Sequence, residues 1–161
     1  MCIRALVALT LIVAGSLLSG CGDQDGRVLR SGSTFVLVGA SGEAPKLPHS
    51  TITGRVSIVG DCVGINGSAV DGATVIWPHG TKITADDPLT IEVPGLGRLG
   101  VGDGVVGSGD LFVNHRPGQE YVDHLPKGID RVPTGCRRNQ VIAFYPDGRH
   151  MSADTRAHRL G

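Results

Sequence analysis

Residues 51–58, TITGRVSI, carry the clearest periodic pattern in the chain. Ile52, Val56 and Ile58 fall on one side of an extended backbone, whereas polar residues occupy the alternate positions. This alternation predicts a half-buried β-strand. Gly54 lies inside the strand and predicts a point where the backbone bends around the corner of a small barrel.

Further short β-prone runs lie on both sides of this strand, and turn residues such as Asn66-Gly67 and Asp71-Gly72 separate them. No window shows ten residues of helical period. Because closing a sheet removes its exposed edges, we predict an all-β fold, a small five- to six-stranded OB-like barrel, with a β-sandwich as the alternative. The predicted strands occupy residues 34–38, 51–58, 62–65, 73–77, 89–93, 98–101, 111–113 and 141–145.

The composition limits the class of protein. A chain of 161 residues has room for one domain, and its 15 basic and 15 acidic residues balance. Aromatic residues make up only 4%, so the core must be built from aliphatic side chains, and 25 glycines favour many turns. These numbers exclude a basic nucleic-acid-binding domain, a coiled coil and a multi-pass membrane protein, so we expect no nucleic-acid partner.

The N-terminal residues predict export and lipidation. Met1–Arg4 carries one positive charge, Ala5–Leu18 is uncharged, and Leu18-Ser19-Gly20-Cys21 matches a bacterial lipobox. Residues 1–20 are therefore expected to be a lipoprotein signal peptide, and Cys21 the lipidated first residue of the mature chain. A plain secretory signal and a short buried apolar helix are the alternatives. The lipid on Cys21 would anchor the protein to the outer face of the bacterial cytoplasmic membrane.

The remaining chain divides into three expected parts. Residues 21–33 are glycine-rich and polar, as a flexible tether that carries the lipid would be. Residues 34–149 are expected to form a single β domain, and residues 150–161 a frayed C-terminal tail. After processing, Cys62 and Cys136 are the remaining cysteines, and in an oxidising compartment they predict one disulfide. Two unpaired thiols are the alternative.

Several motifs allow more than one interpretation. Two G-x-G-x-x-G stretches, residues 95–100 and 102–107, are interpreted as turns because no helix can follow them. Trp77 ends an apolar strand and is expected either to fill one end of the barrel or, with His79 in the next turn, to contact a ligand such as a sugar. The Glu120–His124 region is the densest group of potential metal ligands, but its spacing matches no zinc motif. We expect neither a metal nor a cofactor.

The pattern from Ile52 to Gly109, together with a late Pro-x-x-Cys, resembles small uncharacterised lipoproteins of actinobacteria. The resemblance implies a small β-barrel and supplies no catalytic residues. The sequence favours a non-catalytic binding or structural module of the cell envelope, whose protein or cell-wall partner it does not specify. The alternative is a metal-binding protein or hydrolase that uses the Glu120–His124 region. The shared motifs are residues 54–56 (GRV), Cys62, 75–78 (VIWP), 80–81 (GT), 101–103 (VGD) and 133–136 (PTGC).

Overall fold

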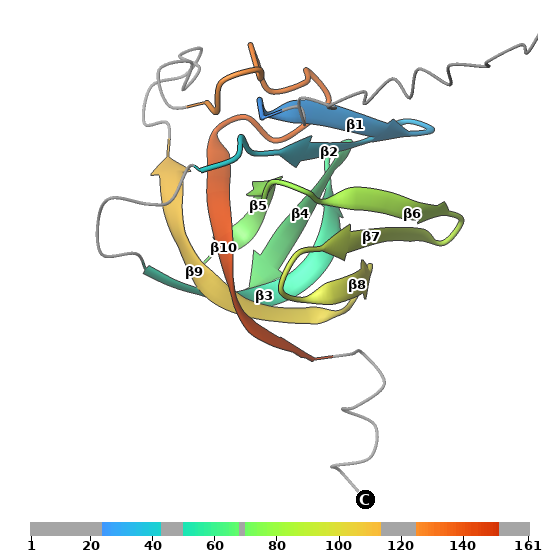
Figure 1. Cartoon of the computed structure of the whole chain (residues 1–161), viewed down its shortest axis with the longest axis vertical. Coiled ribbons are helices and arrows are strands. Elements are labelled where there is room, and N and C mark those ends of the chain that lie inside the picture. Colours follow the sequence, from blue (N-terminus) through green and yellow to red (C-terminus); the bar gives the residue numbers. More distant parts are fainter. Residues whose placement is uncertain (1–23, 43–49, 68–69, 114–124, 152–161) are drawn as a thin grey trace, which may run out of the picture.

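The computed structural model describes residues 24–42, 50–67, 70–113 and 125–151 (Figure 1). All the regular secondary structure in these ranges is β, which confirms the predicted all-β class. The strands are β1 Arg27–Ser31, β2 Thr34–Val38, β3 Ser50–Val59, β4 Cys62–Gly67, β5 Val70–Trp77, β6 Lys82–Asp86, β7 Leu89–Val93, β8 Gly97–Gly100, β9 Gly104–Val113 and β10 Gln140–Met151.

Five of these strands form a complete circuit of pairings. β3, β4 and β5 pair in succession as antiparallel neighbours, and β9 returns to lie antiparallel beside β3. β10 then pairs antiparallel with β9 and parallel with β5. This is a Greek-key order, as in an OB-like barrel. The β1–β2 hairpin joins the circuit beside β4 and β5 and gives a seven-stranded sheet, whereas β6, β7 and β8 form a separate three-stranded sheet.

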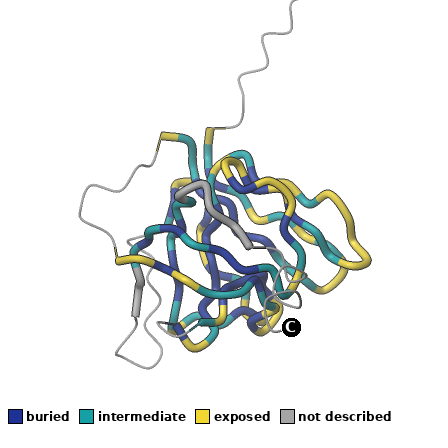
Figure 2. The backbone as a smooth tube through the Cα atoms, turned by 90° about the horizontal axis from the view of Figure 1, so that it is seen from below, coloured by how far each residue is buried: buried dark blue, intermediate teal, exposed yellow. Residues whose placement is uncertain are grey.

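Side chains from both sheets share one core. Trp77 and Phe144 are its largest members, and their rings meet edge-to-face with centroids 5.7 Å apart. Most of the remaining volume is aliphatic, as the low aromatic content requires. Figure 2 colours each residue by its burial, and many of the exposed residues lie at turns and along β6. The three-stranded sheet and its turns contribute Ile91, Val93, Leu96 and Leu99 to this core.

The predicted alternation in β3 holds along most of the strand. Ile52 and Val56 are buried as expected. The expectation that Ile58 shares their burial is wrong, because its side chain is 43% exposed. Ile58 lies near the end of β3, whereas Val59, on the opposite face, is buried and lies near the backbone of Gly64.

A second apolar cluster lies on the outer face of the barrel. Leu37, Ile76 and Val141 belong to it, and each is buried. Ile129 and Val132, from the connection between β9 and β10, cover them. This connection therefore gives the sheet apolar contacts on its outer face as well as on its inner face.

The domain extends beyond its expected limits at both ends. β1 lies within the stretch expected to be a tether, because its residues pair with β2 and Leu29 packs on the core. Five residues, two of them arginines, gave too short and too polar a pattern to predict this strand. At the other end, β10 runs to Met151, so His150 is part of a strand rather than of a frayed tail. Residues 1–23 and 152–161 lie outside the described residues.

Gly54 marks the point where β3 changes partner. Residues 50–55 pair with β9 and residues 55–59 pair with β4, and Figure 1 shows β3 curving between them. A Cβ atom on Gly54 would overlap the side chain of Ile65 and lie 2.7 Å from the carbonyl oxygen of Asn66. Glycine therefore permits this close approach of the strands.

We expect Gly54→Ala to lower the free energy of unfolding by about 1–3 kcal/mol, because the added methyl group must displace packed backbone and side-chain atoms. Gly100→Ala is the matched control: it is also a strand glycine, but the nearest atom to its added Cβ is 3.8 Å away. The control should change stability by less than about 0.5 kcal/mol. Urea denaturation in a soluble Cys21→Ala background measures both, and equal midpoints for the two variants would contradict the packing explanation.

Candidate functional site

Trp77 belongs to the core. Its side chain is fully buried, and its indole Nε1 donates a hydrogen bond of 3.2 Å to the carbonyl oxygen of Val63. The partner satisfies the only polar atom of the ring inside an apolar environment. The interpretation of Trp77 as a core residue is confirmed, and its ring does not form an exposed surface for stacking a sugar.

His79 is exposed in the turn that follows β5. Thr81 holds this turn through a hydrogen bond of 2.7 Å from its Oγ1 to the carbonyl oxygen of Pro78. His79 borders a small pocket whose other walls include the end of β5, Ala40 after β2, Pro126 and Tyr145 of β10. The pocket encloses about 40 Å³, which has room for water but is far below the volume of a drug-sized ligand.

A second depression lies on the three-stranded sheet. Its volume is about 310 Å³, and its lining includes Lys82, Glu92 and Pro94. The register places Lys82 opposite Glu92, and Glu92 opposite Arg98, so charges alternate across the three strands. Cross-strand pairs of this kind stabilise a sheet modestly. Lys82, Glu92 and Pro94 are exposed, whereas Val93 at the base of the depression belongs to the core. The charges of Lys82 and Glu92 balance.

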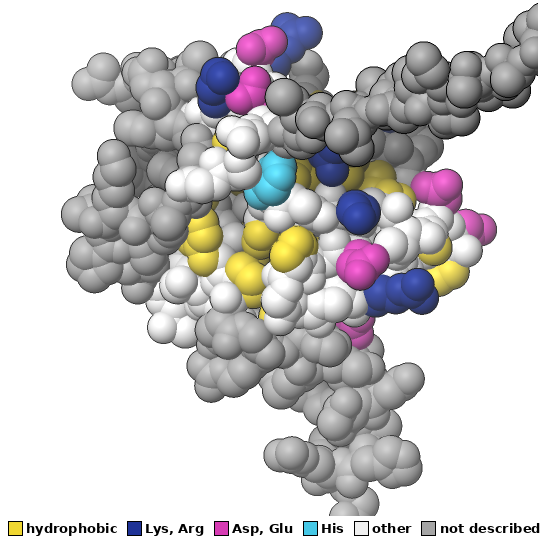
Figure 3. Space-filling model, in the orientation of Figure 1, with side chains coloured by type: hydrophobic (Ala, Val, Ile, Leu, Met, Phe, Trp, Pro, Cys, Tyr) yellow, Lys and Arg dark blue, Asp and Glu magenta, His cyan; other side chains and the backbone are white. Residues whose placement is uncertain are grey.

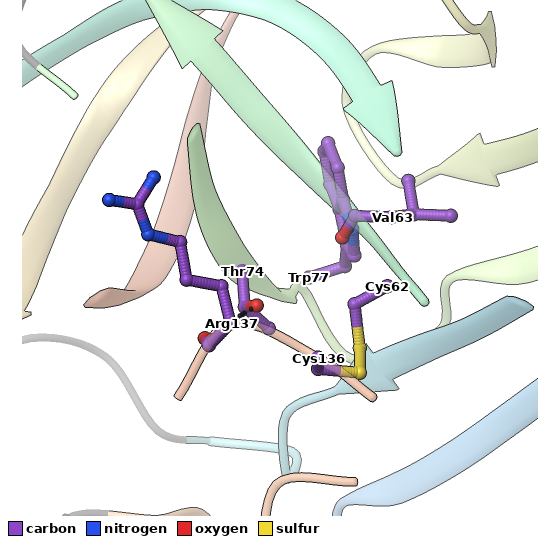
Figure 4. The surroundings of a disulfide bond; sticks show 6 residues. All are labelled: Cys62, Val63, Thr74, Trp77, Cys136 and Arg137. Carbon is purple, nitrogen blue, oxygen red and sulfur yellow. Dashed lines mark hydrogen bonds between the residues drawn. A yellow bond between two sulfur atoms is a disulfide. The ribbon is translucent and has the colours of Figure 1, made fainter. Parts of the chain in front are cut away.

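The predicted disulfide between Cys62 and Cys136 is confirmed, and Figure 4 shows its surroundings. The sulfur atoms are 1.95 Å apart, at bonding distance, and the separation of the Cα atoms, 5.1 Å, lies within the Cα–Cα range of natural disulfides. Both cysteines are buried in the outer apolar cluster. The bond joins the first residue of β4 to the connection that leads into β10.

Residues next to the disulfide add hydrogen bonds between the same segments, and the sequence pattern did not predict them. We call the Cys62–Cys136 bond and the contacts of Thr74 and Arg137 the disulfide junction. Thr74 is fully buried and donates a hydrogen bond of 2.8 Å to the carbonyl oxygen of Arg137. The guanidinium of Arg137 in turn donates to the carbonyl oxygens of Asp71 and Gly72. The only signal in the sequence was a threonine inside the apolar run 73–77, where a buried hydroxyl needs a partner.

The two glycine motifs and the possible metal ligands of the sequence can be compared with the structure. Gly95 and Gly97 have positive φ values of 84° and 81°. Gly95 lies in the turn between β7 and β8 and Gly97 begins β8, so only the start of the first glycine motif is the expected turn. The second motif leads into β9. Across the described ranges no three histidine, cysteine or acidic side chains form a metal-binding group, and no helix is long and apolar enough to span a membrane.

The Glu120–His124 region and Cys21 lie outside the described residues, so their proposed roles in metal binding and lipidation stay predictions. Neither a protein-family model, nor a curated protein, nor a solved structure matches this chain. The resemblance to actinobacterial lipoproteins also stays a prediction. The described residues therefore define three features of interest: the pocket beside His79, the depression on the three-stranded sheet, and the disulfide junction.

The burial of Trp77 predicts the fluorescence of the protein, because the chain has one tryptophan. We expect a blue-shifted emission maximum that iodide quenches poorly until the protein is unfolded. Phe144→Leu should keep the emission blue-shifted while it destabilises the fold, because it removes the ring that faces Trp77. Strong iodide quenching of the native protein would contradict the assignment of Trp77 to the core.

The disulfide predicts a large share of the stability. Its cysteines are separated by 74 positions, and closing a loop of this length stabilises by about 4 kcal/mol in the chain-entropy model. We expect urea denaturation to show that the free energy of unfolding of the Cys62→Ala/Cys136→Ala double variant is about 4 kcal/mol lower than that of the wild-type protein. Alkylation of the wild-type protein should label neither thiol before reduction in denaturant. Native labelling, or equal stability of the two proteins, would contradict this role.

Proposed function

We propose that the chain is an exported lipoprotein, anchored through Cys21, whose β domain acts as a non-catalytic binding or structural module of the bacterial cell envelope. The lipobox sequence Leu18-Ser19-Gly20-Cys21 supports the anchor. The mature chain would then meet the membrane through two or three acyl chains, which are sufficient for stable attachment.

The strongest support for export is the buried disulfide. Disulfides form and persist in oxidising compartments outside the bacterial cytoplasm. Cys62 and Cys136 bond to each other, so Cys21 has no cysteine partner left in the mature sequence and is available for lipidation. Each cysteine that follows the signal sequence then has one chemical role.

The covered outer face of the barrel favours a partner other than a nucleic acid. In OB-like barrels, oligonucleotides and oligosaccharides bind across the second and third strands, which here correspond to β4 and β5. In this protein Cys62 and Ile76 on those strands are buried beneath the connection between β9 and β10. The balanced charge of the chain likewise provides no electrostatic attraction for a polyanion. A partner protein or cell-wall component would therefore meet another part of the surface.

Replacing the acylated cysteine tests the anchor. We expect the wild-type protein to enter the detergent phase in a Triton X-114 partition, and Cys21→Ala to stay in the aqueous phase, because it has no sulfur to acylate. Cys2→Ala is the matched control, since this residue leaves with the signal peptide and its loss should not change the partition. Mass spectrometry of the mature N-terminus should show the acyl groups. An aqueous, unacylated wild-type protein would contradict the proposal.

A further inference from the structure

The first described residues are attached to one corner of the domain. The backbone N–H of Ser41 donates a hydrogen bond of 2.7 Å to the carbonyl oxygen of Gln24, and Gly26 donates one of 2.5 Å to the carbonyl oxygen of Lys127. The ammonium of Lys127 also lies 3.0 Å from a carboxylate oxygen of Asp25. The chain therefore leaves the domain from a defined point.

Glycine allows the backbones at this corner to approach closely. A Cβ atom on Gly128 would overlap the carbonyl oxygen of Gly26 and lie 2.9 Å from the Cβ of Asp25. We call the surface formed by Gln24–Gly26, Ser41 and Pro126–Gly128 the anchor-proximal face. Its exposed side chains are polar or charged, and the charges of Asp25 and Lys127 cancel.

Covalent geometry places the acylation site close to this face. Cys21 precedes Gln24 by three residues, so their Cα atoms are at most about 11 Å apart even in a fully extended chain. The polar headgroup region on each side of a bilayer is about 5–8 Å deep. A lipid on Cys21 would therefore hold Gln24 within a few ångströms of the membrane surface.

We propose that the anchor-proximal face lies against the lipid headgroups of the membrane that holds Cys21, and that the turn between β8 and β9 points away from it. This orientation rests on the proposed lipidation. Figure 1 shows β1 and the orange segment that precedes β10 at one end of the molecule, well separated from that turn. Side chains of both signs gather at the same end in Figure 3, as suits a surface that contacts headgroups without inserting into the acyl chains.

The proposed orientation also determines where the pocket beside His79 lies relative to the membrane. Ala40 and Pro126 line this pocket, and each is the direct neighbour in sequence of a residue whose contacts define the corner, Ser41 and Lys127. The pocket consequently lies at the membrane-facing end of the domain. A molecule that enters it would do so close to the headgroups.

Depth-dependent quenching in vesicles tests the orientation. The mature acylated protein is reconstituted in phosphatidylcholine–phosphatidylglycerol vesicles that contain a lipid with a nitroxide on its headgroup. One fluorophore is attached at Lys127→Cys, whose native side chain is 81% exposed, or at Val101→Cys, whose native side chain is 57% exposed in the turn between β8 and β9. We expect quenching to be several-fold stronger at position 127 than at position 101.

Asp130→Cys provides a second labelling site on the same connection, at an exposed residue. It allows the same measurement if Lys127→Cys does not fold. The non-acylated Cys21→Ala versions should show no quenching at any position. An acylated, vesicle-bound protein with equal quenching at positions 127 and 101, or stronger quenching at 101, would overturn the orientation while leaving the anchor intact. A wild-type protein that is not acylated would overturn the proposed function itself. Quenching at position 127 without Cys21 would show that the tether does not cause the orientation.

Discussion

The parallel pairing of β10 with β5 is the contact on which the barrel depends. Without it, the strands from β5 through β4, β3 and β9 to β10 would form an open, curled sheet. Three register pairs, from Val141↔Thr74 to Ala143↔Ile76, join its two ends. Parallel neighbours need a long connection because the chain must return to the same end of the sheet, and here that connection runs through residues 78–139. Since closing so long a loop costs conformational entropy, β10 needs contacts that hold it in register.

Besides the antiparallel pairing with β9, two residues just before β10 supply contacts of this kind to the β4–β5 hairpin. Cys136 is bonded to Cys62 at the start of β4. The carbonyl of Arg137 accepts the hydroxyl proton of Thr74, and its guanidinium holds carbonyls in the first part of β5. Because Val141 follows only four residues later, little freedom remains for β10 to slip along β5. The three contacts reach different points of the β4–β5 hairpin, so they determine both the position and the direction of the incoming strand.

The features predictable from the sequence are those that depend on neighbouring residues. Alternating burial in β3 and β7 is local, so the strands could be predicted. The strand order depends on pairing between distant segments and could not. The Cys62–Cys136 bond could be predicted by counting cysteines, whereas the strand neighbours around it could not: β9 lies between β3 and β10. β1 was missed because its burial depends on β2 and on the core rather than on its own composition.

The connection between β9 and β10 links the fold to the proposed position at the membrane. Its residues Ile129 and Val132 cover the outer face of the barrel, and Cys136 helps to set the register of β10. Lys127, in the same connection, holds the backbone of Gly26, where the chain arrives from Cys21. A domain on a long tether could turn any face toward a partner. Here the segment that leads into the closing strand also fixes the point where the chain leaves the domain. In the proposed orientation, the stability of the disulfide junction and the placement of the domain at the membrane therefore depend on the same few residues.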